Sequence, residues 1–435
     1  MFKLAYAPYK TWTTIPSLGI RMHARTWLAH EDDPHQVPII LIHGLALSSR
    51  YMVPLGRRLA SMGHDVMAPD LPGFGRSPAP RMSKWPAGPD VREQSNHLLA
   101  WMDANGIHKA VLCGNSVGVQ IAVEIAARFP DRVERLILIA PTPDPAYRTP
   151  ARQYARLVLN MPFEAPSINP LMHMEYLSNG LPRMVQQLRR TVDDPIENRL
   201  SHVHVPALVI RGQYDKTLTQ QWAEEFTSLL PNGKLVVVEG AAHNAHYTAA
   251  PLMSQLVHRF ITGRFDTRAT DMSNEIVVAG MDQGRDRLAP AKLLSPRMHG
   301  LLDYASAGLC LALAGVNEWG PRTRQLFAVA GLSTATYSLL TNYEYGLVRK
   351  LPMTVHLNID TCSGLKLLLA AATLLRGEPV TGRWAVAAQG TFNLLAVAAT
   401  RVPMGPARLV PVQNLSLCAP TDYHPATADE NTYSQ

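Results

Sequence analysis

The sequence predicts an α/β domain, with a mostly parallel sheet and helices on both faces, followed by a four-helix transmembrane bundle. Continuous apolar runs alternate with helical patterns in the first part, as expected of buried parallel strands and their crossover helices. These runs include residues 37–42, 110–113, 206–210 and 234–238. The chain has 435 residues, which exceeds the usual size of one domain and predicts a second unit after about residue 263.

The most informative motif is Gly114-Asn115-Ser116-Val117-Gly118, which directly follows the apolar run 110–113. A strand that reverses into a helix within a few residues forces the serine into a strained conformation, and small neighbours let strand and helix approach closely. Residues 117–129 have the apolar pattern of the required helix, and a proline follows it. The motif therefore predicts that Ser116 is a nucleophile.

Three further signals surround this motif. The apolar run 37–42 leads into a loop where the amide of Leu45 would join that of Val117 in an oxyanion hole. Asp215 follows a buried strand and is the candidate acid of a catalytic triad. His243 follows the next strand and is the candidate base.

With these residues in the order serine, acid, histidine, residues 1–263 resemble the α/β-hydrolase superfamily, in its esterase, lipase and carbon-carbon hydrolase branch. The passage Asp70-Leu71-Pro72-Gly73-Phe74-Gly75-Arg76-Ser77 is also typical of that family. The resemblance implies a helical cap over about residues 142–200, which excludes water and shapes the pocket. It implies neither a cofactor nor a metal at the site.

Each catalytic assignment has a competitor. Asp144 follows another strand, but its proline-flanked setting is more typical of a cap hinge than of a triad acid. His246 lies one helical turn after His243, and we interpret it as a pocket or surface residue. His43 could act as a base, but in this family the corresponding side chain supports the oxyanion loop.

The composition argues against several classes of protein. Four cysteines with no close spacing indicate neither a disulfide framework nor a thiolate metal site, which suits a reducing compartment. The first ten residues lack the apolar core of a secretory signal. The net charge is +7, but the basic residues are scattered and no nucleic-acid motif appears, so we expect no nucleic-acid partner. Arginines near the apolar segments of the second half point instead to anionic lipid headgroups.

The second half is interpreted as a linker over 264–295, a membrane domain over 296–403 and a disordered tail over 404–435. Four segments rich in Leu, Ala, Gly, Ser and Thr approach the length needed to span a bilayer. They are residues 298–316, 324–342, 353–375 and 383–401. Charged residues lie within these spans, so a soluble four-helix bundle remains an alternative.

An internal repeat divides this half into two duplicated hairpins. The repeated residues are Pro296, His299 and Asp303 in the first copy, and Pro352, His356 and Asp360 in the second. The pattern resembles small bacterial membrane domains of the SPW-repeat type. His and Asp four residues apart share a helical face, so they could bind a metal or relay protons. We favour the alternative that each pair satisfies its own polar groups and locks helix packing, because the set of ligands is small.

Positive charges are more numerous in the loops on the side of the two termini, which predicts a multi-pass protein of a bacterial inner membrane with a cytoplasmic hydrolase domain. The expected function is a membrane-anchored serine hydrolase that cleaves an ester or a related activated carbonyl through an acyl-enzyme, with Ser116, His243 and Asp215 as the triad. Its partners would be a small acyl or ester substrate and the lipid bilayer. Perhydrolase or haloperoxidase activity with the same triad, or a non-catalytic protein with this fold, are alternatives.

Overall fold

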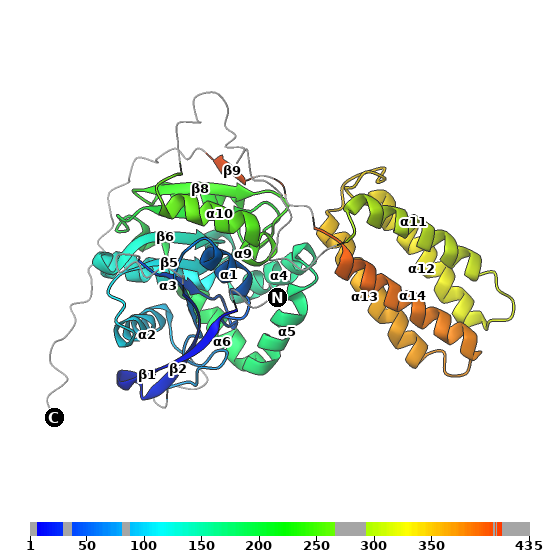
Figure 1. The fold of residues 1–435 in the computed structure, drawn as a ribbon, viewed down its shortest axis with the longest axis horizontal. Helices are drawn as coiled ribbons and strands as arrows, with labels where there is room; N and C mark the ends of the chain where they lie inside the picture. Colours follow the sequence, from blue (N-terminus) through cyan, green and yellow to red (C-terminus); the bar gives the residue numbers. More distant parts are fainter. Residues whose placement is uncertain are drawn as a thin grey trace, which may run out of the picture.

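The computed structural model describes residues 7–28, 37–80, 88–265, 293–402, 405 and 407–410. It consists of an α/β unit and a helical bundle that projects from one side of it (Figure 1). The strands are β1 (Tyr9–Ile15), β2 (Ile20–Trp27), β3 (Ile39–Ile42), β4 (Val66–Pro69), β5 (Ala110–Asn115), β6 (Val133–Ile139), β7 (Ala207–Gly212), β8 (Gly233–Val238) and β9 (Ala407–Val410).

These strands form one sheet in the order β1-β2-β4-β3-β5-β6-β7-β8-β9. Pairing is parallel from β4 through β8, whereas β1, β2 and β9 pair antiparallel at the two edges. The prediction of a mostly parallel sheet is therefore confirmed. Because the carboxyl ends of parallel strands meet at one edge, the loops after β3, β5, β7 and β8 converge there.

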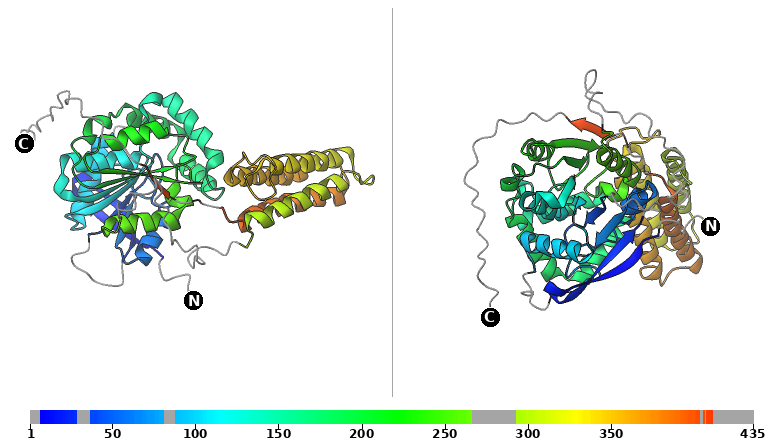
Figure 2. Two further views of the ribbon diagram at one scale, coloured as in Figure 1. Left: turned by 90° about the horizontal axis from the view of Figure 1, so that it is seen from above. Right: turned by 60° about the vertical axis from the view of Figure 1, so that its left-hand side comes forward.

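Helices cover both faces of the sheet (Figure 2). They are α1 (Val53–Ser61), α2 (Val91–Ala104), α3 (Val117–Arg128), α8 (Gln220–Ser228), α9 (Ala245–Thr248) and α10 (Ala250–Ile261). The start of α2 follows from its sequence, since Asp90 and Glu93 form a reciprocal capping box. Helix α3 is buried along its first ten residues, which explains why that segment carries almost no charge.

Short helices fill the segment predicted as the cap, between β6 and β7. They are η3 (Pro145–Tyr147), α4 (Pro150–Asn160), η4 (Met161–Phe163), α5 (Ile168–Asn179), α6 (Leu181–Asp193) and α7 (Glu197–Leu200). Arg148 and Glu197 connect the two ends of the cap through a pair of 2.6 Å hydrogen bonds. Arg199 binds Glu124 of α3 at 3.2 Å and so attaches the cap to the sheet domain.

The second half forms two helical hairpins, one from each copy of the sequence repeat. The helices are α11 (Pro296–Leu313), α12 (Pro321–Leu340), α13 (Met353–Ala372) and α14 (Val380–Ala399). None of the helices in the described ranges combines the length and the apolar character needed to cross a membrane, so the predicted transmembrane bundle is not supported. The physical reason is that aliphatic residues alternate with polar ones such as Asp303, Asp360 and Lys366 along the same helices.

The bundle contacts the cap through Asn358 of α13. The Asn358 amide donates to the carbonyls of Pro162 at 3.1 Å and Glu164 at 2.8 Å, and its oxygen accepts from Asn169 at 2.9 Å. A mostly apolar cavity of about 610 Å³ lies at this junction, between η4 and helices α12 and α13. Ser116 does not line it.

After the bundle the chain returns to the sheet, so the predicted disordered tail over 404–435 is wrong for residues 407–410. Ala407–Val410 pairs antiparallel with β8, and Arg408 binds Glu239 at 2.6 Å. The sequence of this four-residue strand does not predict it, because the strand is stabilised by pairing with β8 rather than by its own residues. Residues 411–435, and 266–292 of the predicted linker, lie outside the described residues.

Candidate active site

Ser116 occupies the sharp turn between β5 and α3, as its flanking glycines require. Its φ and ψ angles are 56° and −117°, a conformation that costs a non-glycine residue about 1 to 3 kcal/mol. A Cβ atom on Gly114 would lie 2.3 Å from the carbonyl oxygen of Gly118, and one on Gly118 would lie 2.3 Å from that of Ile42. The sequence motif therefore reflects the close contact of strand, turn and helix.

The loop after β3 lies directly against this turn. A Cβ atom on Gly44 would lie 3.3 Å from the Cβ of Ser116, so the loop backbone comes close to this serine. Among the described residues, the amides of Leu45 and Val117 have no hydrogen-bond acceptor, which leaves both N–H groups available to an oxyanion. Both amides predicted to form the oxyanion hole are therefore able to donate to a ligand.

His43 braces the loop from inside. Its Nε2 accepts from the amide of Leu71 at 3.0 Å, so its Nδ1 carries the proton and donates to the Gly44 carbonyl at 3.0 Å. Burial lowers the pKa of His43, which keeps the ring neutral. Because both of its nitrogens are used structurally, His43 supports the loop and is not a base.

The structure brings His243 and Asp215 together at the carboxyl ends of β8 and β7. His243 Nδ1 lies 2.9 Å from Asp215 Oδ2 and 2.6 Å from Thr217 Oγ1. The Thr217 hydroxyl donates its proton to Asp215 Oδ1 at 2.6 Å and can therefore only accept from His243. Nδ1 must then carry the proton, which leaves the Nε2 lone pair free to act as a base.

The charges of this pair reinforce one another. Burial raises the pKa of Asp215, but His243 and Thr217 outweigh it and hold that pKa below the usual value. Burial lowers the pKa of His243, but the charge and hydrogen bond of Asp215 have the larger effect. The pKa of His243 therefore lies above the ordinary histidine value. Asp215 is therefore ionised near neutral pH and stabilises a protonated His243.

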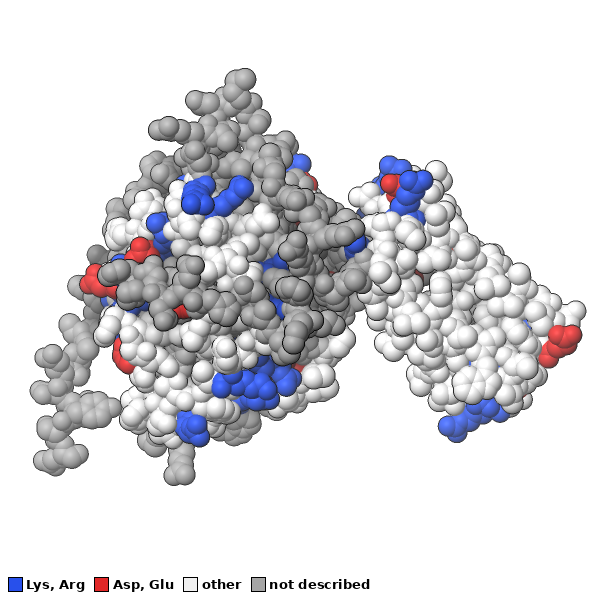
Figure 3. Space-filling model, in the orientation of Figure 1, with Lys and Arg blue, Asp and Glu red and all other residues white. Residues whose placement is uncertain are grey.

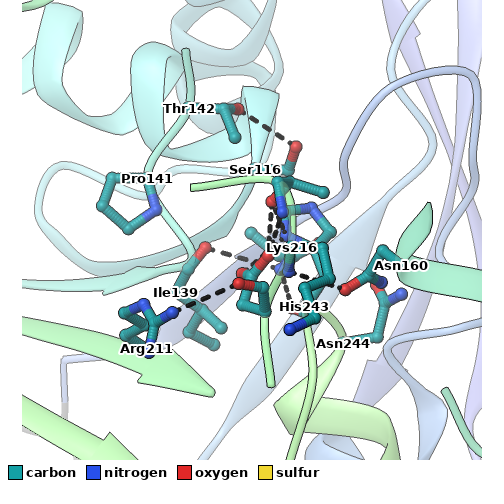
Figure 4. Close-up of polar contacts among 12 residues, drawn as sticks. Ser116, Ile139, Pro141, Thr142, Asn160, Arg211, Lys216, His243 and Asn244 are labelled. Carbon is teal, nitrogen blue, oxygen red and sulfur yellow. Dashed lines mark hydrogen bonds and ion pairs between the residues drawn. The ribbon is translucent and has the colours of Figure 1, made fainter. Parts of the chain in front are cut away.

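The Ser116 hydroxyl is directed toward Thr142 at the base of the cap, at 3.2 Å between the two oxygens (Figure 4). Within the described residues, no hydrogen bond joins Ser116 to His243. Catalytic hydrogen bonds often form only once substrate is bound, and rotation about the Cα–Cβ bond of Ser116 redirects its hydroxyl. Ser116 is 9% exposed, so its side chain is almost completely buried.

Sequence reasoning missed Glu164, a fully buried carboxylate from the cap. It accepts hydrogen bonds from the Asn244 amide and side chain, both at 3.0 Å, and from the Asn160 side chain at 2.7 Å. Asn160 in turn accepts from the Lys216 amide at 3.1 Å. Glu164 thus connects the cap to the loops that hold His243 and Asp215. No local signal marks it, because its partners lie far away in the chain.

The two competitors for the triad have other roles in the structure. Asp144 accepts from the amides of Ala146 at 3.0 Å and Thr219 at 2.8 Å, so it holds the cap hinge to α8. His246 packs edge-on against Tyr51, and its ring nitrogens have no partner among the described residues. Burial lowers the pKa of His246 to about 3, so it remains neutral.

Replacing Asp215 by Asn should lower kcat by about 10⁴-fold, because an amide cannot stabilise the imidazolium and selects the wrong tautomer of His243. Asp144→Asn is the matched control: it should keep kcat near the parent value and cost about 1 kcal/mol of stability through a lost hydrogen bond. Steady-state kinetics and thermal unfolding of both variants measure the difference. A larger loss of kcat in Asp144→Asn would reverse the assignment of the acid.

Comparisons with known proteins agree with this fold. Residues 37–165 match a family described as the alpha/beta hydrolase fold, and residues 183–271 match one described as TAP-like protein. An abhydrolase domain-containing protein, abhd-5.2, from Caenorhabditis elegans is 33% identical over 35% of this chain and 34% of its own length. A 2-hydroxymuconate semialdehyde hydrolase from Pseudomonas putida is 27% identical over 57% of this chain and 95% of its own length.

Among solved structures, a membrane phospholipase A described as a bacterial virulence factor is similar in fold, with a TM-score of 0.50 and 21% identity. The likeness covers 60% of this chain and 88% of that protein. Strands β1 to β8, the serine turn and both family matches lie within residues 9–271. By family match and by sheet order, the first part of this chain has the α/β-hydrolase fold.

Proposed function

We propose that the chain is a serine hydrolase that cleaves an ester, or a related activated carbonyl, through an acyl-enzyme on Ser116. The observation that carries the proposal is the strained Ser116 turn beside two free amides and a histidine whose Nδ1 is held by Asp215. Backbone strain of this kind is concentrated at functional sites, where the surrounding structure holds it in place. The relatives named as hydrolases support the same reaction class.

In the first step His243 Nε2 takes the proton of the Ser116 hydroxyl while Oγ bonds to the substrate carbonyl carbon. The carbonyl oxygen gains the negative charge and is stabilised by the amides of Leu45 and Val117. The intermediate then expels the alcohol, which takes the proton from protonated His243, and the acyl-enzyme remains. Asp215 stays ionised throughout and stabilises the imidazolium.

In the second step water replaces the alcohol. His243 takes a proton from the water molecule, whose oxygen attacks the acyl carbon, and the breakdown of this second intermediate returns the proton to Ser116. The products are a carboxylic acid and the regenerated hydroxyl. Ester turnover by Ser116→Ala beside the parent protein tests the proposal, with loss of turnover in a folded variant as the expected result.

We further propose that the four-helix bundle associates with a lipid bilayer. Its exterior carries many large apolar side chains, each at least 39% exposed: Leu301, Leu309, Leu311, Val329, Leu332, Leu339, Leu340, Leu365, Leu369, Leu374, Val380, Trp384 and Leu395. Figure 3 shows that the visible face of the bundle carries its charges mainly toward the two ends. So large an exposed apolar surface is typical of contact with a membrane or a partner. We propose the cytoplasmic face of a bacterial inner membrane as the location, because its anionic lipid headgroups attract the arginines in the loops of the bundle.

Replacing Leu332 and Leu369 together by Glu should move the full-length protein from the membrane pellet to the supernatant, because two charges would enter the apolar exterior. Leu177→Glu is the matched control: Leu177 is 82% exposed on the cap, so this variant should pellet like the parent. Centrifugation of lysates and immunoblotting measure the distribution. A parent protein that stays in the supernatant would contradict membrane association.

A further inference from the structure

Two histidines and two aspartates meet in the interior of the bundle. His299 and Asp303 lie one turn apart on α11, and His356 and Asp360 lie one turn apart on α13. One ligand atom from each residue lies within 4.8 Å of the other three, and all four side chains are buried. The cluster therefore joins the two hairpins, since each contributes one histidine and one aspartate.

Both histidines are oriented by a threonine outside the cluster. His299 Nδ1 lies 2.7 Å from Thr400 Oγ1, and His356 Nδ1 lies 2.7 Å from Thr341 Oγ1. Each threonine donates its own proton to a helix carbonyl, Thr400 at 2.6 Å and Thr341 at 2.7 Å. The hydroxyls can therefore only accept from Nδ1–H. In both neutral rings the Nε2 lone pair then faces the carboxylates.

This arrangement needs a positive centre. A lone pair on Nε2 repels the carboxylate oxygens that surround it, and buried carboxylates without a counter-charge are costly. His356 Nε2 is fully buried and, among the described residues, has no hydrogen-bond partner of acceptable geometry, although Asp303 and Asp360 oxygens lie 3.1 and 3.2 Å away. His299 Nε2 lies 3.0 Å from Asp360 Oδ2, a contact that is a hydrogen bond if this nitrogen carries a proton, and 3.3 Å from Asp303 Oδ1.

These separations match the edges of a metal coordination sphere. Four nitrogen and oxygen ligands at about 2.0 to 2.1 Å from a tetrahedral zinc ion are about 3.3 Å apart. Both histidine nitrogens lie 3.0 to 3.2 Å from the same oxygen of Asp360, within a few tenths of an ångström of that value. Asp303 faces His299 with one carboxylate oxygen at 3.3 Å and His356 with the other at 3.1 Å, so a small rotation of this carboxylate would bring one oxygen to the ion. When both imidazoles are neutral, the two carboxylates together balance the charge of one divalent ion.

We propose that His299, Asp303, His356 and Asp360 bind one divalent transition-metal ion, for which zinc has the best-fitting chemistry. Imidazole nitrogen and carboxylate oxygen suit zinc, and a closed set of four protein ligands is typical of a structural site. The threonines fix the histidine rings, and Tyr337 donates to Asp360 Oδ1, as outer partners of metal ligands do. The ion would crosslink α11 to α13 and hold the two hairpins together.

The competing arrangement is a metal-free cluster with protonated histidines. Burial lowers the pKa of His356, but the carboxylates of Asp303 and Asp360 have the larger, opposite effect and raise this pKa to about 9. Two imidazolium ions and two carboxylates would also be neutral overall. The two arrangements differ in metal content, and this difference is directly measurable.

The test is metal analysis of the full-length protein, purified without chelating resin, by plasma mass spectrometry. We expect about one zinc ion per chain, lost on dialysis against a chelator and regained from zinc chloride, with a fall and recovery of the melting temperature of about 5 °C. Cobalt added to the metal-free protein should give the visible absorption of a tetrahedral site. Asp303→Asn and Asp360→Asn should bind neither metal, because each loses one anionic ligand.

Asn393→Ala is the matched control, because it removes a buried polar side chain of α14 outside the cluster and should retain the metal. A folded parent protein that neither contains zinc nor takes up zinc or cobalt overturns the proposal in favour of the protonated cluster. Metal retained in folded Asp303→Asn and Asp360→Asn also overturns it, because the ion is then bound elsewhere. If one aspartate variant fails to fold, the other variant, together with chelation and reloading of the parent, still decides between the metal site and the protonated cluster.

Discussion

Ser116→Ala should lower kcat/KM for a short-chain nitrophenyl ester by at least about 10³-fold, because no acyl-enzyme can form without the hydroxyl. The fold should survive, since the substitution removes only the hydroxyl of one small side chain. Initial rates with the purified variant, together with its circular dichroism spectrum, measure both effects.

Thr142→Val is the matched control for this variant. It removes the hydroxyl that pairs with Ser116 at 3.2 Å but leaves the nucleophile and its base in place. We expect its kcat/KM to stay within about tenfold of the parent, because the lost hydrogen bond contributes about 1 kcal/mol. A folded Ser116→Ala protein that hydrolyses the ester at the parent rate would show that the reaction takes place elsewhere.

His243→Ala should have an effect as large as that of Ser116→Ala, and the parent enzyme should lose activity as the pH falls. His243 accepts a proton only when neutral, so activity is present above its pKa and disappears below it. Because Asp215 raises that pKa, the inflection in kcat/KM should lie above the ordinary histidine value of about 6.5. A pH profile between about 5 and 9 measures it.

His246→Asn is the control for this assignment. His246 is buried against Tyr51, and its pKa of about 3 means that it does not titrate in the measured range. The variant should keep the inflection of the parent profile, although the changed packing can lower stability. An inflection that disappears in His246→Asn while His243→Ala retains activity would reverse the two roles.

The sequence predicts the serine turn well because its cause is local. Gly114 and Gly118 are required by contacts within one strand, one turn and the neighbouring strand. Asp215 and His243 follow from their position after buried strands, since parallel strands deliver their carboxyl ends to one edge. Glu164 and Thr217 could not be predicted in the same way, because their roles depend on three-dimensional contacts with residues that carry no motif.

In the second half, too, local features could be predicted and long-range contacts could not. Its four helices and its repeat are local features, and the structure contains helices at all four predicted segments. The repeat placed His299 with Asp303 on one helical face, and His356 with Asp360 on another, but it could not show that the two faces meet. The return of Ala407–Val410 to the sheet depends on pairing with a strand about 170 residues earlier, which no local pattern encodes.

The most direct test of the central claim is the reaction of the full-length parent protein with a fluorophosphonate, followed by intact-mass and peptide mass spectrometry. The proposed mechanism predicts one phosphonyl group per chain, attached to Ser116, with labelling that slows when His243 is replaced by Ala. A folded parent protein that takes up no label, or takes it up on a residue other than Ser116, would contradict the account.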